Sequence, residues 1–184
     1  MGAGLGGGSS DAAAVLTALD AIFETHLGVE GLERIAGELG SDVPFFIRRQ
    51  AAWCRGRGEQ IEAWELPEKL PLLLLKPVFG VETPWAYKNW ARSRDLPGLD
   101  GAEQDLGWVK ISNSLERPAF EKFLVLAAMK QWLRAQPGVR AAAMSGSGST
   151  MFAVLESASG ANDLMSRSRA EFGDSLWLAA CETD

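Results

Sequence analysis

The sequence has little of what metal-binding and disulfide-stabilised proteins need. Its 184 residues include two cysteines and one histidine. Cys54 and Cys181 stand far apart and form no Cys-x-x-Cys pair, which indicates neither a zinc site nor a disulfide framework. We therefore expect reduced thiols and a cytoplasmic location.

An excess of basic charge is also absent. The chain has 18 lysines and arginines against 24 aspartates and glutamates, a net charge of -6. Because binding to a nucleic-acid backbone normally needs a clustered basic face, this balance argues against a nucleic-acid partner. Any phosphate group that the protein binds must be held by local geometry.

Long apolar runs are missing as well. The most apolar stretch, Leu70–Leu75, is interrupted by Pro71, and a membrane span takes about 20 residues. Met1 is followed by glycines and not by a basic segment and an apolar run, so no secretory signal is indicated. We expect no membrane association.

Helical spacing and turn residues organise the first third of the chain. They predict a helix from about Ser10 to His26 with Ser9, Ser10 and Asp11 as cap and first-turn residues, then a second helix that ends at Gly40. A short helical turn is expected to open at residues 41–44. Residues 50–54 and 60–64 flank a Gly-rich turn and predict a hairpin.

The order of elements beyond Pro67 indicates a particular fold. The pattern predicts strands at residues 72–75, 139–144, 150–155 and 176–181, helices at 83–90, 118–135 and 162–172, and a loop from Pro97 to Gly107. This β-α-β-β-α-β order is that of the ferredoxin-like split βαβ fold, an antiparallel sheet with helices on one face.

The predicted fold class is therefore α+β, with a first domain at residues 1–66 and a second at 67–184. Charge supports the division, because residues 1–66 carry 5 of the 18 basic but 10 of the 24 acidic side chains.

Glycines are frequent, 20 in all, and crowd at two places. The first cluster, Gly4–Gly8, runs through Ser9 and Ser10 directly into the predicted helix. Glycines allow consecutive amides to converge on an anion at a helix N-terminus, so the segment predicts a phosphate-binding loop. No Walker motif occurs, and a Rossmann motif would need a strand before it. The alternative is a flexible glycine linker ahead of a capped helix.

The second cluster, Ser145–Thr150, joins two predicted strands. By itself it is typical of a tight hairpin whose hydroxyls bind turn amides. Together with the first cluster it could form a second wall around the same phosphates.

Asp42 precedes a strongly apolar segment. It could accept a proton from a substrate hydroxyl, or cap the helical turn led by Pro44. Spacing alone does not separate these two interpretations.

These segments resemble, in order, the motifs of the GHMP small-molecule kinases. The similarity covers nearly the whole chain and rests on seven segments: Gly2–Ala13, Leu39–Phe46, Gly56–Glu59, Lys76–Pro77, Thr83–Pro84 with Tyr87, Ser112–Asn113 and Met144–Phe152.

The resemblance implies roles for single residues. The ATP triphosphate would be bound by the first glycine segment, which consists of Gly4, Leu5, Gly6, Gly7, Gly8, Ser9 and Ser10, with Ser9 or Ser10 near Mg²⁺. Asp42 would be the catalytic carboxylate. The substrate would contact Thr83, Tyr87, Ser145, Gly146, Ser147 and Gly148, with the Tyr87 ring against a cytosine.

Within the family, the similarity is greatest to the branch whose substrate carries a cytidine diphosphate group. That branch phosphorylates the C2 hydroxyl of 4-diphosphocytidyl-2-C-methyl-D-erythritol in isoprenoid precursor synthesis. The alternatives are a GHMP kinase with a different alcohol, or a nucleotide-binding remnant without catalysis.

The chain departs from the family at its start. Family members carry a segment before the phosphate loop, with a lysine- and asparagine-containing motif and contacts to adenine and to the substrate. This chain begins inside the phosphate-loop motif. We therefore expect a truncated first domain, and little activity from residues 1–184 alone.

Overall fold

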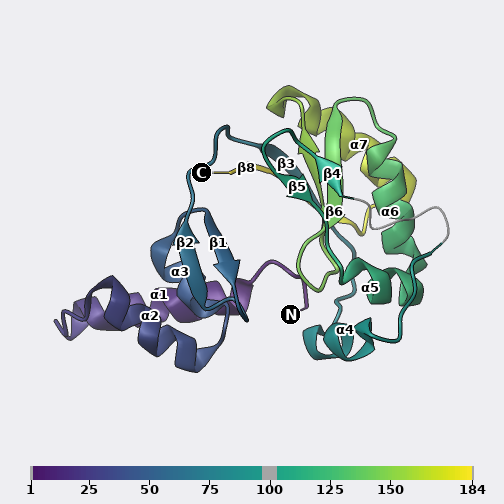
Figure 1. Cartoon of the computed structure of the whole chain (residues 1–184). Helices are drawn as coiled ribbons and strands as arrows, with labels where there is room; N and C mark the ends of the chain where they lie inside the picture. The colour runs from purple at the N-terminus through teal and green to yellow at the C-terminus, as the bar shows by residue number, and fades with distance from the viewer. Residues whose placement is uncertain (1, 97–102, 184) are drawn as a thin grey trace. The chain divides into compact units, whose positions relative to one another are not determined.

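The computed structural model describes residues 2–96 and 103–183. They form two compact units, coloured along the chain in Figure 1. The first contains Gly6–Glu68, and the second contains Lys69–Thr183 together with Gly2–Leu5. The chain thus starts in the second unit and enters the first at Gly6.

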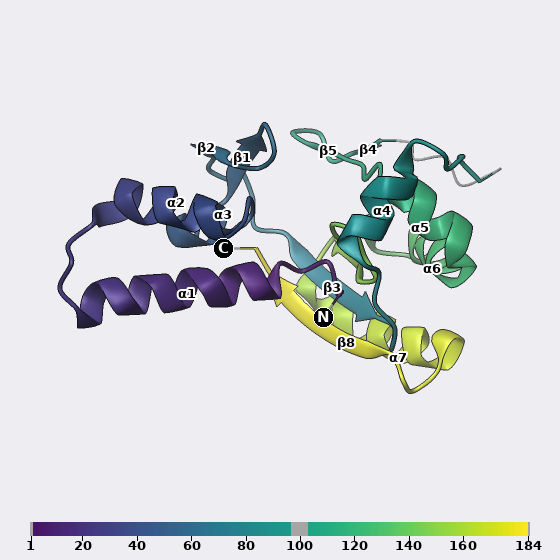
Figure 2. The ribbon, with the colours of Figure 1, turned by 90° about the horizontal axis from the view of Figure 1, so that it is seen from below.

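The first unit is mainly helical. Its elements are α1 (Gly7–Ile22), α2 (Gly28–Leu39), α3 (Val43–Arg48), β1 (Ala52–Arg55) and β2 (Gln60–Ala63). Helices α1 and α2 lie side by side in Figure 2, and β1 and β2 form the predicted antiparallel hairpin. The buried core is small and includes a cluster of Ala13, Ala36 and Val43, with partly buried neighbours.

The predicted helix at residues 10–26 is wrong at both ends. It begins at Gly7, because Gly6 adopts a left-handed conformation with φ of 66°. Ser9 and Ser10 are therefore helical residues and not caps. The helix ends at Ile22, and Asp20 then accepts hydrogen bonds from the Thr25 hydroxyl and the Leu27 amide, which fold the chain into a turn.

The second unit contains the predicted four-stranded sheet. Its strands are β3 (Pro71–Lys76), β6 (Val139–Met144), β7 (Met151–Leu155) and β8 (Trp177–Glu182), in the order β6-β7-β3-β8. All neighbours are antiparallel, with Leu73 opposite both Ala153 and Ala180. The ferredoxin-like order expected from the sequence is confirmed.

The predicted helix at residues 118–135 is two helices, α5 (Glu116–Lys122) and α6 (Leu124–Arg134). The break falls at Phe123, whose φ and ψ of -121° and 77° are not helical. Its ring stacks on Phe79 at a centroid distance of 4.9 Å. Packing against another segment therefore overrides the helical pattern.

The two faces of the sheet are covered differently. Leu73, Leu75 and Ala153 share the main core with α6 and with α7 (Ala161–Phe172). On the other face, Val154 packs with residues of the small hairpin of β4 (Gln104–Asp105) and β5 (Lys110–Ile111), seen opposite α6 in Figure 1. Residues 104–105 were expected in a loop, and residues 97–102 of that loop lie outside the described residues.

Two short helices complete the description. Helix α4 (Thr83–Trp90) has the predicted bounds, and the 3₁₀ turn η1 (Ala158–Gly160) precedes α7. Among residues 2–96 and 103–183, no helix combines the length and apolar character needed to cross a membrane.

Candidate active site

The beginning of the chain is fixed by hydrogen bonds and is not a flexible linker. The Gly2 carbonyl accepts from the amides of Val81 and Ser149, both at 3.1 Å, and the Ala3 carbonyl accepts from the Thr150 amide at 3.0 Å. These bonds tie Gly2–Leu5 to Val81 and to the second glycine cluster, Ser145–Thr150, here called the second glycine segment.

Gly4 must be glycine for structural reasons. Its φ is 76°, and a Cβ at this position would lie 2.1 Å from the Ser145 carbonyl oxygen and 2.9 Å from the Gly148 nitrogen. The Ser145 hydroxyl donates to the Gly4 carbonyl at 2.7 Å. Gly4 is therefore where the two glycine segments touch.

Gly7 and Gly8 are different, because the fold does not require them. Neither has a positive φ, and a Cβ at either position would meet nothing within 4 Å. Both lie in the first turn of α1. Their missing side chains leave open space around the helix N-terminus, and this space is what an approaching ligand would need.

The first turn of α1 has amides to offer such a ligand. The first backbone bond of the helix is donated by the Ser10 amide to the Gly6 carbonyl at 2.9 Å. The amides of Gly7, Gly8 and Ser9 have no helical acceptor, as at any helix start. No side chain caps the helix, and no acidic residue lies in its first turn. With about half a positive charge from the helix dipole, this end suits an anion.

The second glycine segment is a tight turn, but its hydroxyls do not serve the turn. The Ser145 amide donates to the Thr150 carbonyl and the Gly148 amide to the Ser145 carbonyl, at 2.8 and 2.9 Å. The side chains of Ser145, Ser147 and Ser149 reach other segments instead. The simple hairpin interpretation therefore explains the backbone and leaves the hydroxyls unexplained.

Thr83 and Tyr87 lie on α4, one helical turn apart. The Thr83 and Ser147 hydroxyls are 2.8 Å apart and share a hydrogen bond, which places Thr83 against the second glycine segment. The Tyr87 side chain is 66% exposed, so its ring has a free face. The second unit thus brings together Gly4, Thr83 and the Ser145–Gly148 turn.

Asp42 lies in the first unit at the N-cap position of α3, yet it makes no side-chain capping bond. Its exposed carboxylate lies near Gly58 of the hairpin turn, where Oδ1 would be 3.4 Å from an added Cβ. Phe46, one turn along α3, lies against Gly6 at the start of α1. The cap interpretation loses its hydrogen bond, and the carboxylate stays available for chemistry.

Cys54 is not a candidate nucleophile. Burial, and secondly the negative charge of Asp42, raises the pKa of its thiol. A raised pKa disfavours the reactive thiolate.

The Mg²⁺ ion implied by the family resemblance would have two protein ligands, the hydroxyls of Ser9 and Ser10. The Ser10 hydroxyl donates to the Gly7 carbonyl at 2.9 Å and keeps its oxygen lone pairs, and Ser9 lies beside it in the same turn. Within residues 2–96 and 103–183, no group of three or more histidine, cysteine, aspartate or glutamate side chains could hold a metal ion. Mg²⁺ commonly takes one or two protein ligands and completes its shell with phosphate oxygens and water, so hydroxyls at this position fit it.

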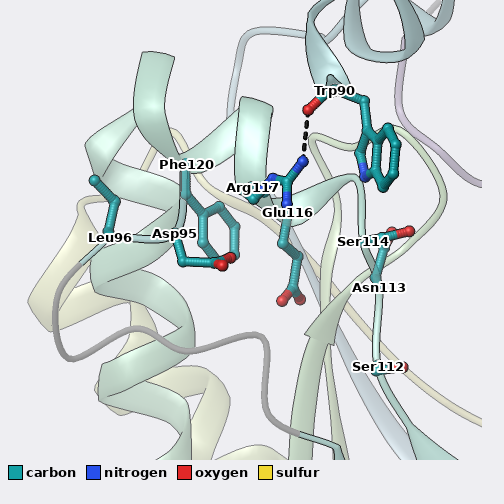
Figure 3. Close-up of a pocket in the computed structure, with 9 residues that line it drawn as sticks. All are labelled: Trp90, Asp95, Leu96, Ser112, Asn113, Ser114, Glu116, Arg117 and Phe120. Carbon is teal, nitrogen blue, oxygen red and sulfur yellow. Dashed lines mark hydrogen bonds between the residues drawn. The ribbon is translucent and has the colours of Figure 1, made fainter. Parts of the chain in front are cut away.

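Sequence reasoning gave no role to a second set of polar residues. The second unit contains a cavity of about 270 Å³. Figure 3 shows the residues that line it, which are Trp90, Asp95, Leu96, Ser112, Asn113, Ser114, Glu116, Arg117 and Phe120. Arg117 donates to the Trp90 carbonyl at 2.7 Å, drawn there as a dashed line. None of the residues predicted for the site is among those that line it.

Glu116 and Lys130 form a buried ion pair in this region, with side chains 3% and 2% exposed. A signal existed in the sequence, because Lys130 lies among the apolar residues Met129 and Leu133 of its helix. Such a lysine needs a buried partner.

Comparison with known proteins agrees with the fold. Residues 1–50 match the model of the GHMP kinases N terminal domain, and residues 99–174 match that of the GHMP kinases C terminal. The expected α+β fold of a GHMP kinase is thereby confirmed.

Two curated relatives with the same name match almost the whole chain. The 4-diphosphocytidyl-2-C-methyl-D-erythritol kinase of Methylacidiphilum infernorum is 42% identical over 98% of this chain and 64% of its own length. The enzyme of that name from Thermodesulfovibrio yellowstonii is 30% identical over 100% of this chain and 67% of its own length. The chain thus spans about two thirds or less of the length of these relatives.

Two solved structures are similar. A crystal structure of 4-(cytidine 5'-diphospho)-2C-methyl-D-erythritol kinase has a TM-score of 0.74 and 36% identity, over 98% of this chain and 66% of that one. Homoserine kinase from Cytophaga hutchinsonii has a TM-score of 0.69 and 18% identity, over 100% of this chain and 66% of that one. At this identity the likeness shows the shared fold alone. The N-terminal and C-terminal family models match in chain order, and the listed relatives align with almost the whole chain. This protein therefore belongs to the GHMP kinase family.

Proposed function

We propose that the protein is an ATP-dependent kinase that transfers a phosphoryl group to the C2 hydroxyl of 4-diphosphocytidyl-2-C-methyl-D-erythritol. The name shared by its relatives at 30–42% identity supports this substrate. The observation that carries the proposal is the start of α1, where Gly7 and Gly8 leave open space over amides that no protein group caps. The fold does not require glycine at these two positions. A bound triphosphate would require it, because a side chain there would keep phosphate oxygens away from the amides.

In this proposal the triphosphate of ATP lies on the first turn of α1. The amides of Gly7, Gly8 and Ser9 donate to phosphate oxygens, and such charge-assisted bonds are stronger than neutral ones. The Ser9 and Ser10 hydroxyls would hold Mg²⁺. That ion, when bound, neutralises the charge on the phosphates.

The acceptor alcohol is bound by the second unit in this proposal. The cytosine stacks on the exposed Tyr87 ring, while Thr83 and the Ser145–Gly148 turn contact the rest of the substrate. Asp42 accepts the proton of the attacking hydroxyl or orients it. Phosphoryl transfer needs positioning and charge neutralisation more than covalent chemistry, which agrees with a site made of backbone amides and one carboxylate.

The test is phosphoryl transfer by the purified chain, and by a form that carries the family's additional segment before Met1. ATP is supplied with 4-diphosphocytidyl-2-C-methyl-D-erythritol, or with homoserine as a competing alcohol, and the products are identified by mass spectrometry. Transfer to the cytidine-containing alcohol supports the proposal. Transfer to homoserine alone would show that the proposed substrate is wrong. Absence of ATP binding in both forms would refute the assignment of the phosphate-binding loop.

A further inference from the structure

The residue before the second glycine turn is held from two sides by side chains. Met144 ends β6, and its amide donates to Glu116 Oε1 at 2.8 Å. Its carbonyl accepts from Asn113 Nδ2 at 2.7 Å. The same Asn113 nitrogen donates to the Gly146 carbonyl, also at 2.7 Å. One side-chain amide therefore joins the end of the strand to the middle of the turn.

Asn113 is itself fixed in the orientation that these bonds need. Its Oδ1 accepts from the Leu115 amide at 2.9 Å, and its carbonyl accepts from the Glu116 amide at 3.0 Å. Because Oδ1 is used in this way, Nδ2 must face the two carbonyls. A flipped amide would place oxygen against oxygen and lose all three side-chain bonds.

Glu116 is fixed by the buried ion pair. Its Oε2 binds Lys130 Nζ, which leaves Oε1 for the Met144 amide. Both side chains are at least 97% removed from solvent, where an unpaired charge would cost several kcal/mol. This arrangement therefore has little freedom to move.

The turn that follows needs such support, since two of its residues are glycines. Gly146 and Gly148 have φ of 54° and 91°, and flexible glycines lose more conformational entropy on ordering than other residues. If the turn were ordered only by a ligand, binding would bear that cost.

We propose that Asn113 and Glu116 are positioning residues that hold Ser145–Gly148 in its substrate-binding conformation before the substrate arrives. This inference rests on the proposed function, in which that turn contacts the cytidine diphosphate part of the substrate. Neither residue touches the substrate in this account. Both act through the backbone of Met144 and Gly146.

The chain offers a matched control in Gln104. Its Nε2 donates to the Ala142 carbonyl at 2.8 Å, and its Oε1 accepts from the Ala142 amide at 2.9 Å. Gln104 thus makes the same kind of contact with β6, two residues before Met144. Within the described part of the chain both of its side-chain hydrogen bonds go to Ala142 and neither to the glycine turn, so its loss should cost stability without loosening the turn.

The experiment compares Asn113→Ala, Asn113→Asp and Gln104→Ala with the wild-type protein. Asn113→Asp keeps the volume and the bond to Leu115 but removes the NH₂ donor, so it isolates the two bonds to the carbonyls. Hydrogen exchange is measured at the amides of Gly148, Ser149 and Thr150, which are bonded in the structure. Amides of the central strand β3 report any loss of stability in the whole unit.

We expect exchange at these three amides to become about tenfold faster in both Asn113 variants, relative to β3, and to stay within about twofold in Gln104→Ala. Calorimetry with CDP as the probe should show about tenfold weaker binding in the same two variants only. A residue that merely filled space would be rescued by the isosteric Asn113→Asp.

The outcomes separate this inference from the proposed function. Unchanged exchange in both Asn113 variants would overturn the positioning role, whatever the wild-type protein binds. Faster exchange with unchanged CDP affinity would overturn it too, because the order of the turn would then not serve binding. Wild-type protein that binds neither CDP nor ATP would refute the proposed function, while faster exchange in Asn113→Asp would still support the hold on the turn.

Discussion

Replacing Gly7 with valine should abolish nucleotide binding while the protein stays folded. A Cβ at Gly7 meets nothing within 4 Å, and the residue has no positive φ. Valine is a slightly better helix residue than glycine, so we expect the free energy of unfolding to change by less than about 0.5 kcal/mol. The added side chain would instead occupy the space in which the triphosphate approaches the amides.

The size of the effect follows from the bonds that are lost. Hydrogen bonds to charged groups contribute about 1.5–3 kcal/mol each. If the valine side chain keeps phosphate oxygens from two amides of the first turn, ATP binding weakens by about 3 kcal/mol or more. That corresponds to roughly 100-fold or more in Kd.

The assay combines calorimetry with ATP and thermal unfolding, and two other glycines serve as controls. Gly160 likewise has open space around its Cβ position, so Gly160→Val should leave ATP binding unchanged. Because Gly160 is the N-cap residue of α7, this variant should lose a small amount of stability. Gly4→Ala should lower the unfolding temperature, because its Cβ would lie 2.1 Å from the Ser145 carbonyl oxygen. Undiminished ATP binding by folded Gly7→Val would show that the start of α1 is not the phosphate site.

Three further predictions concern single side chains. Asp42→Asn should reduce phosphoryl transfer by about 10²–10⁴-fold, measured as ADP release, and leave the Kd for ATP within about twofold; equal losses in both would contradict a role in catalysis. Tyr87→Ala should raise the KM for the cytidine-containing substrate by about tenfold or more and that for ATP far less, since stacking on one base contributes about 1–3 kcal/mol. Hydrogen bonds from the Thr25 hydroxyl and then the Leu27 amide lower the pKa of Asp20. The turn after α1 should therefore be stable above the ordinary aspartate pKa of 3.8 and loosen as the pH falls through the lower folded value. Asp20→Asn should remove this acid-dependent step in limited proteolysis, and an unchanged pH profile would refute the assignment.

Sequence reasoning succeeded where local signals and tertiary structure agree. The bounds of α4 follow from Thr83-Pro84 at its start, and the end of α2 follows from Gly40. The four strands of the second sheet were recognised because apolar runs alternate with helices of suitable length. Helix ends and turns are determined by residues close to them in the chain, so they can be predicted from a single sequence.

Sequence reasoning failed where the local structure depends on residues that are distant in the sequence. Nothing near Phe123 indicates the break between α5 and α6, where the Phe123 ring packs on Phe79 and Trp85, 44 and 38 positions away in the sequence. The strands β4 and β5 have two residues each and are too short for any periodic pattern. Asn113 was recognised only as part of a resemblance, since its partners Met144 and Gly146 come together with it through the tertiary fold.

The outer side of β6 has a consequence for how the protein behaves at high concentration. An outer strand normally presents unpaired amides and carbonyls to which a strand of another molecule can bond. At Ala142 and Met144 these groups are already bonded to Gln104, Asn113 and Glu116. Intermolecular sheet extension along this edge, the first step of many aggregation processes, is thereby blocked at Ala142 and Met144 by side chains of β4, of α5 and of the segment between them.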